Sequence, residues 1–297
     1  MDRRKFLKVS AAGLIGLSQL DKAMAQLSGI GAEEAVKVDR VALGNSGIVT
    51  SRIAMGTGSI GGNGASNQTR LGTENFVKLA HHVYERGVTF FDMADAYGSQ
   101  PYVGAALKAL PREKVTLLTK MTHQRDGSPA VQDVSKVLDR FRLEIGTDYI
   151  DILLMHFINQ PDWATTRTHY MEGLTRAKEA GIVKAIGISC HNLQALSVAA
   201  DNPWVDVIMA RINPFGTNMD GDPDSVKEIL GRAKRNGKGI VGMKIFGEGK
   251  HVRDDEREAS FKFALTEGNV HCMTLGLESI AQADDAIDRV MRLVKEV

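Results

Sequence analysis

The chain has 297 residues, of which 43% are hydrophobic and 25% are charged, and its formal net charge is +1. This balance is typical of a globular protein with one sizeable core. A net charge so close to zero gives no electrostatic reason to expect binding to nucleic acid or to an anionic membrane. No apolar run reaches the ~18 residues that a spanning helix needs, so stable membrane insertion is not expected.

The first 25 residues predict a targeting segment instead of part of the fold. Arg3 and Arg4 precede Phe6-Leu7, a weakly apolar stretch covers residues 9–20, and Ala23-Met24-Ala25 offers a small-residue cleavage site. This arrangement resembles a bacterial twin-arginine signal, which implies the twin-arginine export machinery as a partner and a periplasmic or other extracytoplasmic location. The alternative is a basic amphipathic N-terminal helix. A linker is expected over residues 26–37 and a single folded domain over residues 38–297.

The sequence contains only two cysteines, Cys190 and Cys272, and they fall in different predicted strand–helix units. A disulfide would suit an oxidising compartment, yet nothing in the sequence pairs these residues. We expect two buried, unpaired thiols.

The predicted elements start with a β-hairpin, in which Val38–Leu43 and Val49–Arg52 flank a Gly-Asn-Ser-Gly turn. From Ile53 onward, short β-rich runs alternate with longer amphipathic runs. Eight strands that are each followed by a helix favour a closed parallel barrel, a (β/α)8 TIM barrel with an N-terminal β-hairpin, over an open doubly wound sheet. The predicted strands are Arg52–Thr57, Thr89–Ala94, Lys114–Met121, Tyr149–His156, Ala185–Ser189, Val205–Arg211, Gly239–Ile245 and Val270–Leu275. The clearest helical patterns are Glu74–Arg86, Val131–Leu143, Tyr170–Ala180 and Asp224–Asn236.

Polar residues end three consecutive apolar strands of this predicted barrel. Asp92 and Tyr97 follow the second strand, Lys120 ends the third, and His156 ends the fourth. Neighbouring strand ends lie side by side in a barrel, and a lysine there needs a partner such as Asp92. A nearby ammonium ion favours the phenolate of Tyr97 and makes it a better proton donor at neutral pH. His156 could hydrogen-bond the same substrate oxygen and orient a carbonyl group.

Several strings of residues together resemble the aldo-keto reductase family. The resemblance implies that Tyr97 donates the proton, Lys120 lowers its pKa, Asp92 pairs with Lys120 and His156 positions the carbonyl. It also implies a nicotinamide cofactor, NAD(P)H, and a small-molecule carbonyl substrate: an aldehyde, a ketone or a sugar. The strings are "VDRVALGNSGIVTSRIAMGTGSIGG" from residue 38, "FDMADAYG", "LLTKM", "DILLMHF" and "LTRAKEAGIVKAIGIS", in the family's order and spacing.

The same resemblance assigns cofactor contacts to the strand ends and the loops that follow them. Ser189 matches the family pattern, but Cys190 and Met209 stand where the family commonly has an asparagine and a glutamine. Met243 replaces a tyrosine that stacks on the nicotinamide ring, although a methionine can also pack against an aromatic face. Lys244 is placed either to contact the pyrophosphate or as a solvated lysine at the rim. The full set of cofactor-binding candidates is Gly56, Thr57, Ser189, Met209, Met243, Lys244, Gly276 and Gln282.

The last strand–helix unit argues against a preference for NADPH. Gln282 lies where family members that use NADPH bind the 2′-phosphate with basic residues, while Glu278, Asp284 and Asp285 are close by. No lysine or arginine lies nearby in this stretch before Arg289. A phosphate dianion beside carboxylates is unfavourable. Either NADH is preferred, dinucleotide binding is weak, or residues elsewhere compensate.

Other candidate residues are less informative. His81-His82 lies within a predicted helix, so the two rings point in different directions and are expected at the surface or in packing. His123, His156 and His191 could meet at the barrel rim, but no HxH or HExxH spacing supports a metal site, and none is expected. Trp163 could line a substrate pocket or pack between loops.

Two classes of function fit this sequence. The first is an exported aldo-keto reductase, and the second is an exported barrel binding protein or pseudoenzyme with weakened dinucleotide binding. The intact set of four residues favours the enzyme, because a binding protein does not need all four. The altered cofactor contacts and the export signal favour the binding protein, since the periplasm lacks a ready supply of reduced nicotinamide. Twin-arginine export of a folded protein already loaded with cofactor would reconcile the two.

The export signal leads to a direct test. Replacing Arg3 and Arg4 with lysine should leave the precursor in the cytoplasm, because the twin-arginine route depends on that pair. Cell fractionation with detection of the mature chain measures the outcome. Mature protein still found outside the cytoplasm would contradict the signal interpretation.

Overall fold

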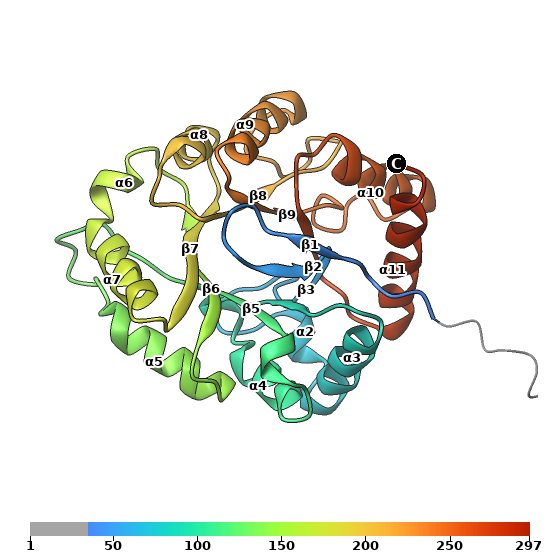
Figure 1. The fold of residues 1–297 in the computed structure, drawn as a ribbon, viewed down its shortest axis with the longest axis horizontal. Coiled ribbons are helices and arrows are strands. Elements are labelled where there is room, and N and C mark those ends of the chain that lie inside the picture. Colours follow the sequence, from blue (N-terminus) through green and yellow to red (C-terminus); the bar gives the residue numbers. More distant parts are fainter. Residues whose placement is uncertain (1–34) are drawn as a thin grey trace, which may run out of the picture. The chain divides into compact units, whose positions relative to one another are not determined.

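The computed structural model describes residues 35–297, and within it Lys37–Val297 form one compact unit. Figure 1 shows the helices of this unit arranged around a central set of strands. The predicted signal segment and most of the predicted linker lie outside the described residues. Their interpretation therefore stays a prediction.

Within residues 35–297, eight parallel strands close into a barrel in the order β10-β3-β4-β5-β6-β7-β8-β9. The closure is direct, because β10 pairs with both β3 and β9, with Leu275 opposite Met55 and Met273 opposite Gly242. The predicted (β/α)8 architecture is confirmed, and the strands differ from the prediction only by a few residues at their ends. The barrel strands are β3 (Ile53–Gly56), β4 (Phe90–Asp92), β5 (Thr116–Met121), β6 (Ile150–Ile158), β7 (Val183–Cys190), β8 (Val207–Arg211), β9 (Gly239–Met243) and β10 (Cys272–Leu275).

Helices follow the strands and form the outer layer of the barrel. Several end where predicted, at a glycine whose positive φ stops the helix: Gly87 (φ 89°), Gly181 (φ 72°) and Gly237 (φ 77°). None of the helices in the described part of the chain is long and apolar enough to cross a membrane. The α-helices are α2 (Asn67–Arg70), α3 (Thr73–Glu85), α4 (Gln100–Leu107), α5 (Val134–Ile145), α6 (Trp163–Thr166), α7 (Thr168–Glu179), α8 (Leu193–Asp201), α9 (Pro223–Arg235), α10 (Asp254–Thr266) and α11 (Ile280–Val294), with 3₁₀ turns η1 (Asp95–Tyr97) and η2 (Arg112–Lys114).

The first and last long helices meet and complete the outer ring. In Figure 1, α11 lies beside α3, and an ion pair between Arg86 and Asp284 joins the end of α3 to α11. The ring of helices therefore closes at the same place in the chain as the ring of strands.

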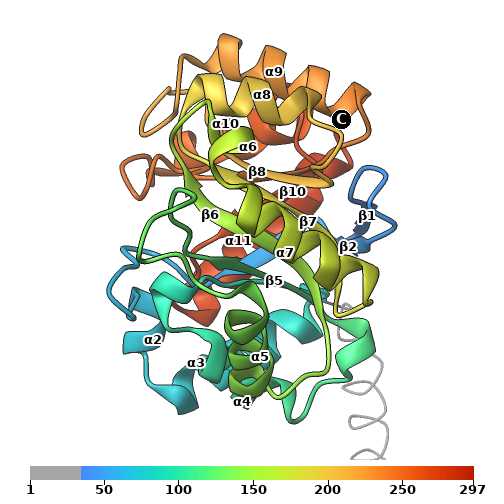
Figure 2. The ribbon, with the colours of Figure 1, turned by 90° about the vertical axis from the view of Figure 1, so that its left-hand side faces the viewer.

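The N-terminal hairpin closes one end of the barrel. Strand β1 (Arg40–Ala42) pairs antiparallel with β2 (Val49–Ser51), and Leu43 between them is fully buried with the residues of the barrel interior. Gly239 at the start of β9 packs so closely on Leu43 that an added Cβ would overlap it. Figure 2 shows the hairpin at one end of the strands. Polar groups are thereby left at the opposite, carboxyl end of the strands.

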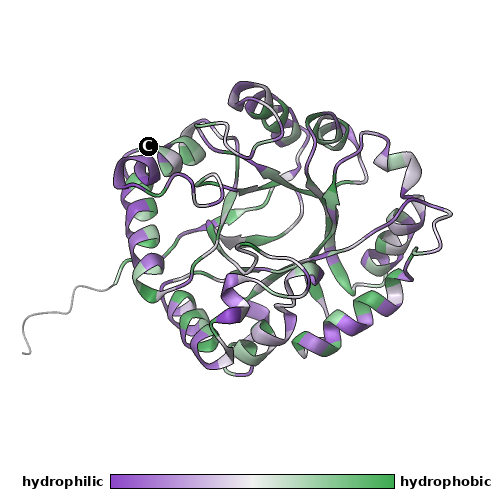
Figure 3. Cartoon of the chain, turned by 180° about the vertical axis from the view of Figure 1, so that it is seen from behind, coloured by the Kyte–Doolittle hydropathy of each residue, from purple (hydrophilic) through white to green (hydrophobic). Residues whose placement is uncertain are grey.

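Two apolar layers stabilise the fold, one inside the barrel and one between the strands and helices. Figure 3 shows mainly hydrophobic strands, while the helices alternate between hydrophobic and hydrophilic positions along their turns. Cys272 belongs to the interior layer and Cys190 to the outer one, and both thiols are free and buried, as predicted. Burial raises the pKa of Cys272 to about 12 and the pKa of Cys190 well above its ordinary value.

Candidate active site

A buried ion pair forms the base of the site. Asp92 ends β4 and Lys120 lies near the end of β5, and the lysine ammonium donates to Asp92 Oδ1 and, at 2.8 Å, to the carbonyl oxygen of Met93. Their side chains are only 7% and 1% exposed. Burial by itself would lower the pKa of Lys120, but Asp92 and Tyr97 outweigh it and hold the pKa above its ordinary value. The ammonium is therefore a fixed positive charge at neutral pH.

Two further side chains hold Asp92 in place. Thr274 on β10 donates from Oγ1 to Asp92 Oδ2 at 2.8 Å, so both carboxylate oxygens have partners. Thr57 donates its hydroxyl to the backbone carbonyl of Asp92 at 2.8 Å, and its Oγ1 lies 2.7 Å from the hydroxyl of Ser99. The pair is thus anchored from β10 and from the residue that follows β3, as well as from its own strands.

Tyr97 ends the 3₁₀ turn that follows β4 and lies above Lys120. The Lys120 Nζ atom is 5.1 Å from the centroid of the Tyr97 ring. Gly58 and Gly61 pack directly against the ring, where an added Cβ at either position would overlap it. Burial raises the pKa of Tyr97 above its ordinary value, and the charge of Lys120 opposes this rise without cancelling it. The sequence had predicted a net lowering, and desolvation by the surrounding loops is the reason for the difference.

His156 on β6 faces the phenol oxygen. Its Nε2 atom lies 3.4 Å from the Tyr97 hydroxyl, and the two rings meet edge-on with centroids 5.6 Å apart. Burial, together with the charge of Lys120 and the neighbouring His123, lowers the pKa of His156 to about 3. The imidazole is therefore neutral at physiological pH and can share a hydrogen bond with a substrate oxygen.

Two other histidines lie near His156, but each is held by an arginine. His191 accepts from Arg211 at Nδ1, and its ring centroid is 6.4 Å from that of His156. His123 accepts at Nδ1 from Arg167 Nε at 2.9 Å. Among the residues that the structure describes, no three His, Cys, Asp or Glu side chains are grouped as metal ligands.

A cavity of about 710 Å³ is lined by Asp92 and Tyr97 and also by residues around the start of α11. Thr57 and Ser189 are fully buried and do not line it, and Ser189 Oγ lies 3.4 Å from His191 Nε2. The remaining predicted cofactor contacts all line the cavity: Gly56, Met209, Met243, Lys244, Gly276 and Gln282.

The far end of the cavity shows two features that the sequence of the last strand–helix unit does not reveal. Arg257 on α10 lines the cavity, so a cation from outside the last strand–helix unit reaches this end, one of the alternatives that the sequence left open. Of the three carboxylates considered, Glu278 and Asp285 line the cavity, whereas Asp284 turns away to Arg86 and His82. The sequence could not show Arg257 here, because α10 precedes the last strand and reaches this point only through the packing of α10 against α11.

The cavity residues fit a nicotinamide dinucleotide. Met209 and Met243, which are 1% and 9% exposed, give the end near Tyr97 an apolar surface on which an aromatic ring can pack. Gly276 lines the cavity and packs closely on Ser59, whose hydroxyl an added Cβ would overlap. Ser279 caps α11, whose N-terminus suits negatively charged groups. Lys244, with φ 58°, faces the same cavity and pairs with Glu248.

Comparison with known proteins assigns the family. The sequence profile of the Aldo/keto reductase family matches residues 52–295. The chain belongs to this family. L-galactose dehydrogenase of Arabidopsis thaliana is 26% identical over 258 residues, which cover 81% of this chain and 77% of that protein. The NADH-specific methylglyoxal reductase of Escherichia coli is 28% identical over 205 residues, covering 62% and 61%. The match to "Probable aldo-keto reductase 1" of Glycine max, at 32% identity, spans 45% of that protein.

Solved aldo-keto reductases share the fold. The holo form of an aldo-keto reductase from Bacillus halodurans superimposes with a TM-score of 0.66 at 17% identity, covering 87% of this chain and 96% of that chain. An enzyme from Klebsiella pneumoniae in complex with NADP and acetate gives a TM-score of 0.63 at 16% identity, covering 87% and 95%. Family and fold together support an NAD(P)H-dependent oxidoreductase that acts between carbonyls and alcohols.

The depressed histidine pKa values of this family member predict an acid-sensitive fold. Burial lowers the pKa of His156 to about 3, of His123 to about 4 and of His191 to about 2. The unfolded chain then binds more protons than the folded one below the ordinary histidine pKa of about 6.5. Stability is complete above that pH and falls as the pH drops below it, by at most about 1.4 kcal/mol per pH unit for each histidine.

Urea unfolding between pH 7 and pH 4 measures this slope. His156→Gln should make the fall shallower, because one proton-binding difference between the folded and unfolded states is removed. Equal slopes for the variant and the wild type would contradict a role for buried, neutral His156.

Proposed function

We propose that this protein reduces a carbonyl group of an aldehyde, ketone or sugar to an alcohol with NAD(P)H, and that Tyr97 donates the proton. The observation that carries the proposal is the position of the Tyr97 hydroxyl. It faces His156 Nε2 at 3.4 Å on one side and lies near the Lys120–Asp92 pair on the other, in the wall of the cavity. A binding protein has no evident need for a phenol placed between a neutral imidazole and a buried ammonium ion.

The roles of the side chains follow from their charges. Tyr97 and His156 hydrogen-bond the substrate oxygen and so orient the carbonyl group. A bound nicotinamide would supply the hydride. As negative charge develops on that oxygen, the Tyr97 proton moves to it, and the phenolate left behind is stabilised by the fixed charge of Lys120. The ion pair with Asp92 holds the Lys120 ammonium in its buried position.

We also propose that NADPH binds this chain no better than NADH. Among the described residues that line the cavity, the basic side chains are Lys244 and Arg257. Lys244 pairs with Glu248, and Arg257 pairs with Asp285. Glu278 adds a further negative charge to the same wall. A 2′-phosphate entering there would displace existing ion pairs or lie beside carboxylates. The Escherichia coli relative is NADH-specific by name, in keeping with this choice.

Export through the twin-arginine route stays part of the proposal. Its support is the sequence of residues 1–25, which lie outside the described residues. An exported reductase would have to retain its cofactor and have it recycled in place, because the periplasm offers no ready supply of reduced nicotinamide.

Removing the Tyr97 hydroxyl tests the proton-donor role. Tyr97→Phe should lower the rate of carbonyl reduction roughly 10²–10⁴-fold, the contribution typical of one positioned general acid. Affinity for the dinucleotide should change little, because the ring remains. Tyr102→Phe is the matched control, since Tyr102 packs on Phe76 with ring centroids 5.7 Å apart in the outer layer. Near wild-type turnover by Tyr97→Phe would exclude Tyr97 as the proton donor.

Adding a cation at the start of α11 tests the choice of cofactor. Gln282→Arg should favour NADPH by roughly 1–3 kcal/mol, the usual range for hydrogen bonds to charged groups. The control is Gln194→Arg, which adds the same charge at an exposed position on α8. Wild-type preference for NADPH above about tenfold would overturn the proposal, since 1.4 kcal/mol corresponds to that factor.

Paired titrations at low and physiological salt measure both affinities. Calorimetry, or the fluorescence of the reduced nucleotide itself, is a better readout of binding than tryptophan fluorescence. Trp163 and Trp204 lie against each other with ring centroids 6.1 Å apart, and neither lines the cavity. Their emission would therefore report binding only weakly.

A further inference from the structure

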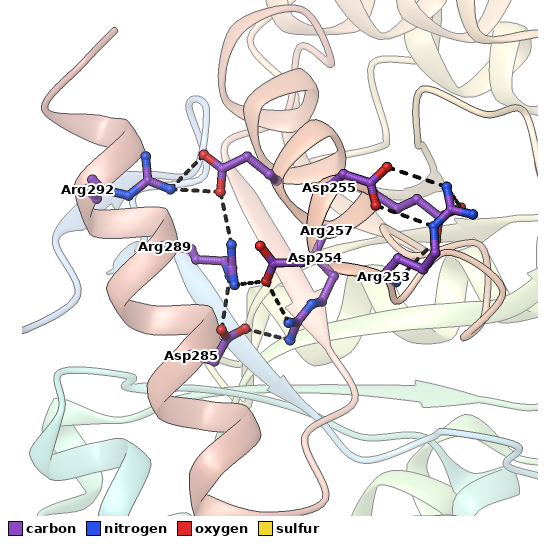
Figure 4. Close-up of polar contacts among 9 residues, drawn as sticks. Arg253, Asp254, Asp255, Arg257, Asp285, Arg289 and Arg292 are labelled. Atoms are coloured by element: carbon purple, nitrogen blue, oxygen red, sulfur yellow. Dashed lines mark hydrogen bonds and ion pairs between the residues drawn. The ribbon is translucent and has the colours of Figure 1, made fainter.

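Arg257 and Asp285 form an ion pair in the wall of the cavity, at the end away from Tyr97. Arg257 Nη1 donates to Asp285 Oδ2 at 2.7 Å, and the two side chains are 27% and 31% exposed. The other carboxylate oxygen of Asp285 accepts from Arg289 Nε at 3.0 Å. Figure 4 shows both arginines directed at Asp285, one from α10 and one from within α11.

The guanidinium of Arg257 still has donors to offer. Its Nη2 atom lies 3.3 Å from Asp254 Oδ1, but the side chain of Asp254 is 77% exposed, so water screens this contact. Its Nε atom is buried and has no hydrogen-bond partner among the described residues. A guanidinium has five donors in a fixed planar fork that suits phosphate oxygens. Asp285 is thus the partner that holds Arg257 most firmly.

The charge of Arg257 is compensated by Asp285. A phosphate that approaches meets this paired arginine, and also Glu278 on the same wall. Removing the charge of Asp285 would free Arg257 Nη1 and leave the guanidinium with only its screened contact to Asp254. The described side chains that form this part of the network are Arg257, Arg289 and Arg292 with Asp254, Glu258 and Asp285.

We infer that Asp285 is a specificity-determining residue that keeps Arg257 from binding the 2′-phosphate of a dinucleotide. Arg257 on α10 could bind the 2′-phosphate of NADPH, but its ion pair with Asp285 on α11 keeps it from doing so. The inference rests on the proposed function for the placement of the adenosine half at this end of the cavity. It goes further by locating the choice of dinucleotide in one ion pair between two helices.

The test is neutralisation of Asp285 without loss of its shape. Asp285→Asn should raise the ratio of NADPH affinity to NADH affinity roughly 10- to 100-fold, as one charge-assisted contact allows. The matched control is Asp284→Asn, the adjacent residue with the same charge change. Asp284 pairs with Arg86 and His82 and does not line the cavity, so its variant should change the ratio less than about threefold by screened long-range charge alone.

A second substitution isolates Arg257. Arg257→Gln in the Asp285→Asn background should return the ratio to within about threefold of the wild type, because the contact depends on the freed guanidinium. Calorimetric titrations with NADPH and NADH, repeated with 2′,5′-ADP and 5′-ADP, give the ratios. Asp285→Ser is a second neutral variant, and circular dichroism verifies that each variant is folded.

Three results would overturn the inference. An equal gain in Asp284→Asn would indicate a general charge effect. A gain that persists after Arg257→Gln would indicate another cation, and an unchanged ratio in folded Asp285→Asn and Asp285→Ser would exclude release of Arg257. Failure of the proposed function is distinguishable, because a protein that binds both dinucleotides but reduces no carbonyl would contradict the proposed function and leave the affinity ratios intact as the test of the ion pair.

Discussion

An ammonium ion buried at the end of an apolar strand is stable only beside an anion, and Asp92 supplies that anion to Lys120. The pair is almost completely removed from water, so separating the two charges would be costly. This requirement fixes the ends of β4 and β5 relative to each other. It also draws in Thr274 from β10, which occupies the second oxygen of Asp92. The arrangement of Tyr97 and His156 above the pair depends on that fixed charge.

The barrel explains why the chemistry gathers at one end. Its interior is filled by apolar side chains, and the hairpin residue Leu43 closes the end opposite the site. Polar groups can therefore be accommodated only at the carboxyl ends of the strands and in the loops that follow, as in other barrels of this kind. In the loop after β3, Gly58 and Gly61 pack on the Tyr97 ring and exclude water from one side of it. The same packing raises the pKa of the phenol, so Tyr97 keeps its proton at neutral pH.

The two ends of the cavity pose different physical problems. Near Tyr97, thioether side chains from Met209 and Met243 provide apolar contact in place of directional hydrogen bonds. At the start of α11, the wall carries the Arg257–Asp285 ion pair and the carboxylate of Glu278. At the nicotinamide, recognition of a dinucleotide would rest more on apolar contact than on directional hydrogen bonds. At the adenosine, it would depend on whether the Arg257–Asp285 ion pair stays intact.

The sequence by itself determined the (β/α)8 fold and the positions of Asp92, Lys120 and His156 at the ends of consecutive strands. It could do so because strand–helix alternation and polar strand ends are local features, and neighbouring strands in a barrel follow chain order. Only the tertiary structure showed that Thr274 binds Asp92 and that Arg257 reaches the cavity. These contacts depend on closure of β10 against β3 and on packing of α10 against α11, which join residues distant in the chain. The direction of the Tyr97 pKa shift was also decided by the tertiary structure. The neighbouring charge of Lys120 can be inferred from a sequence motif, but desolvation depends on every loop that covers the ring.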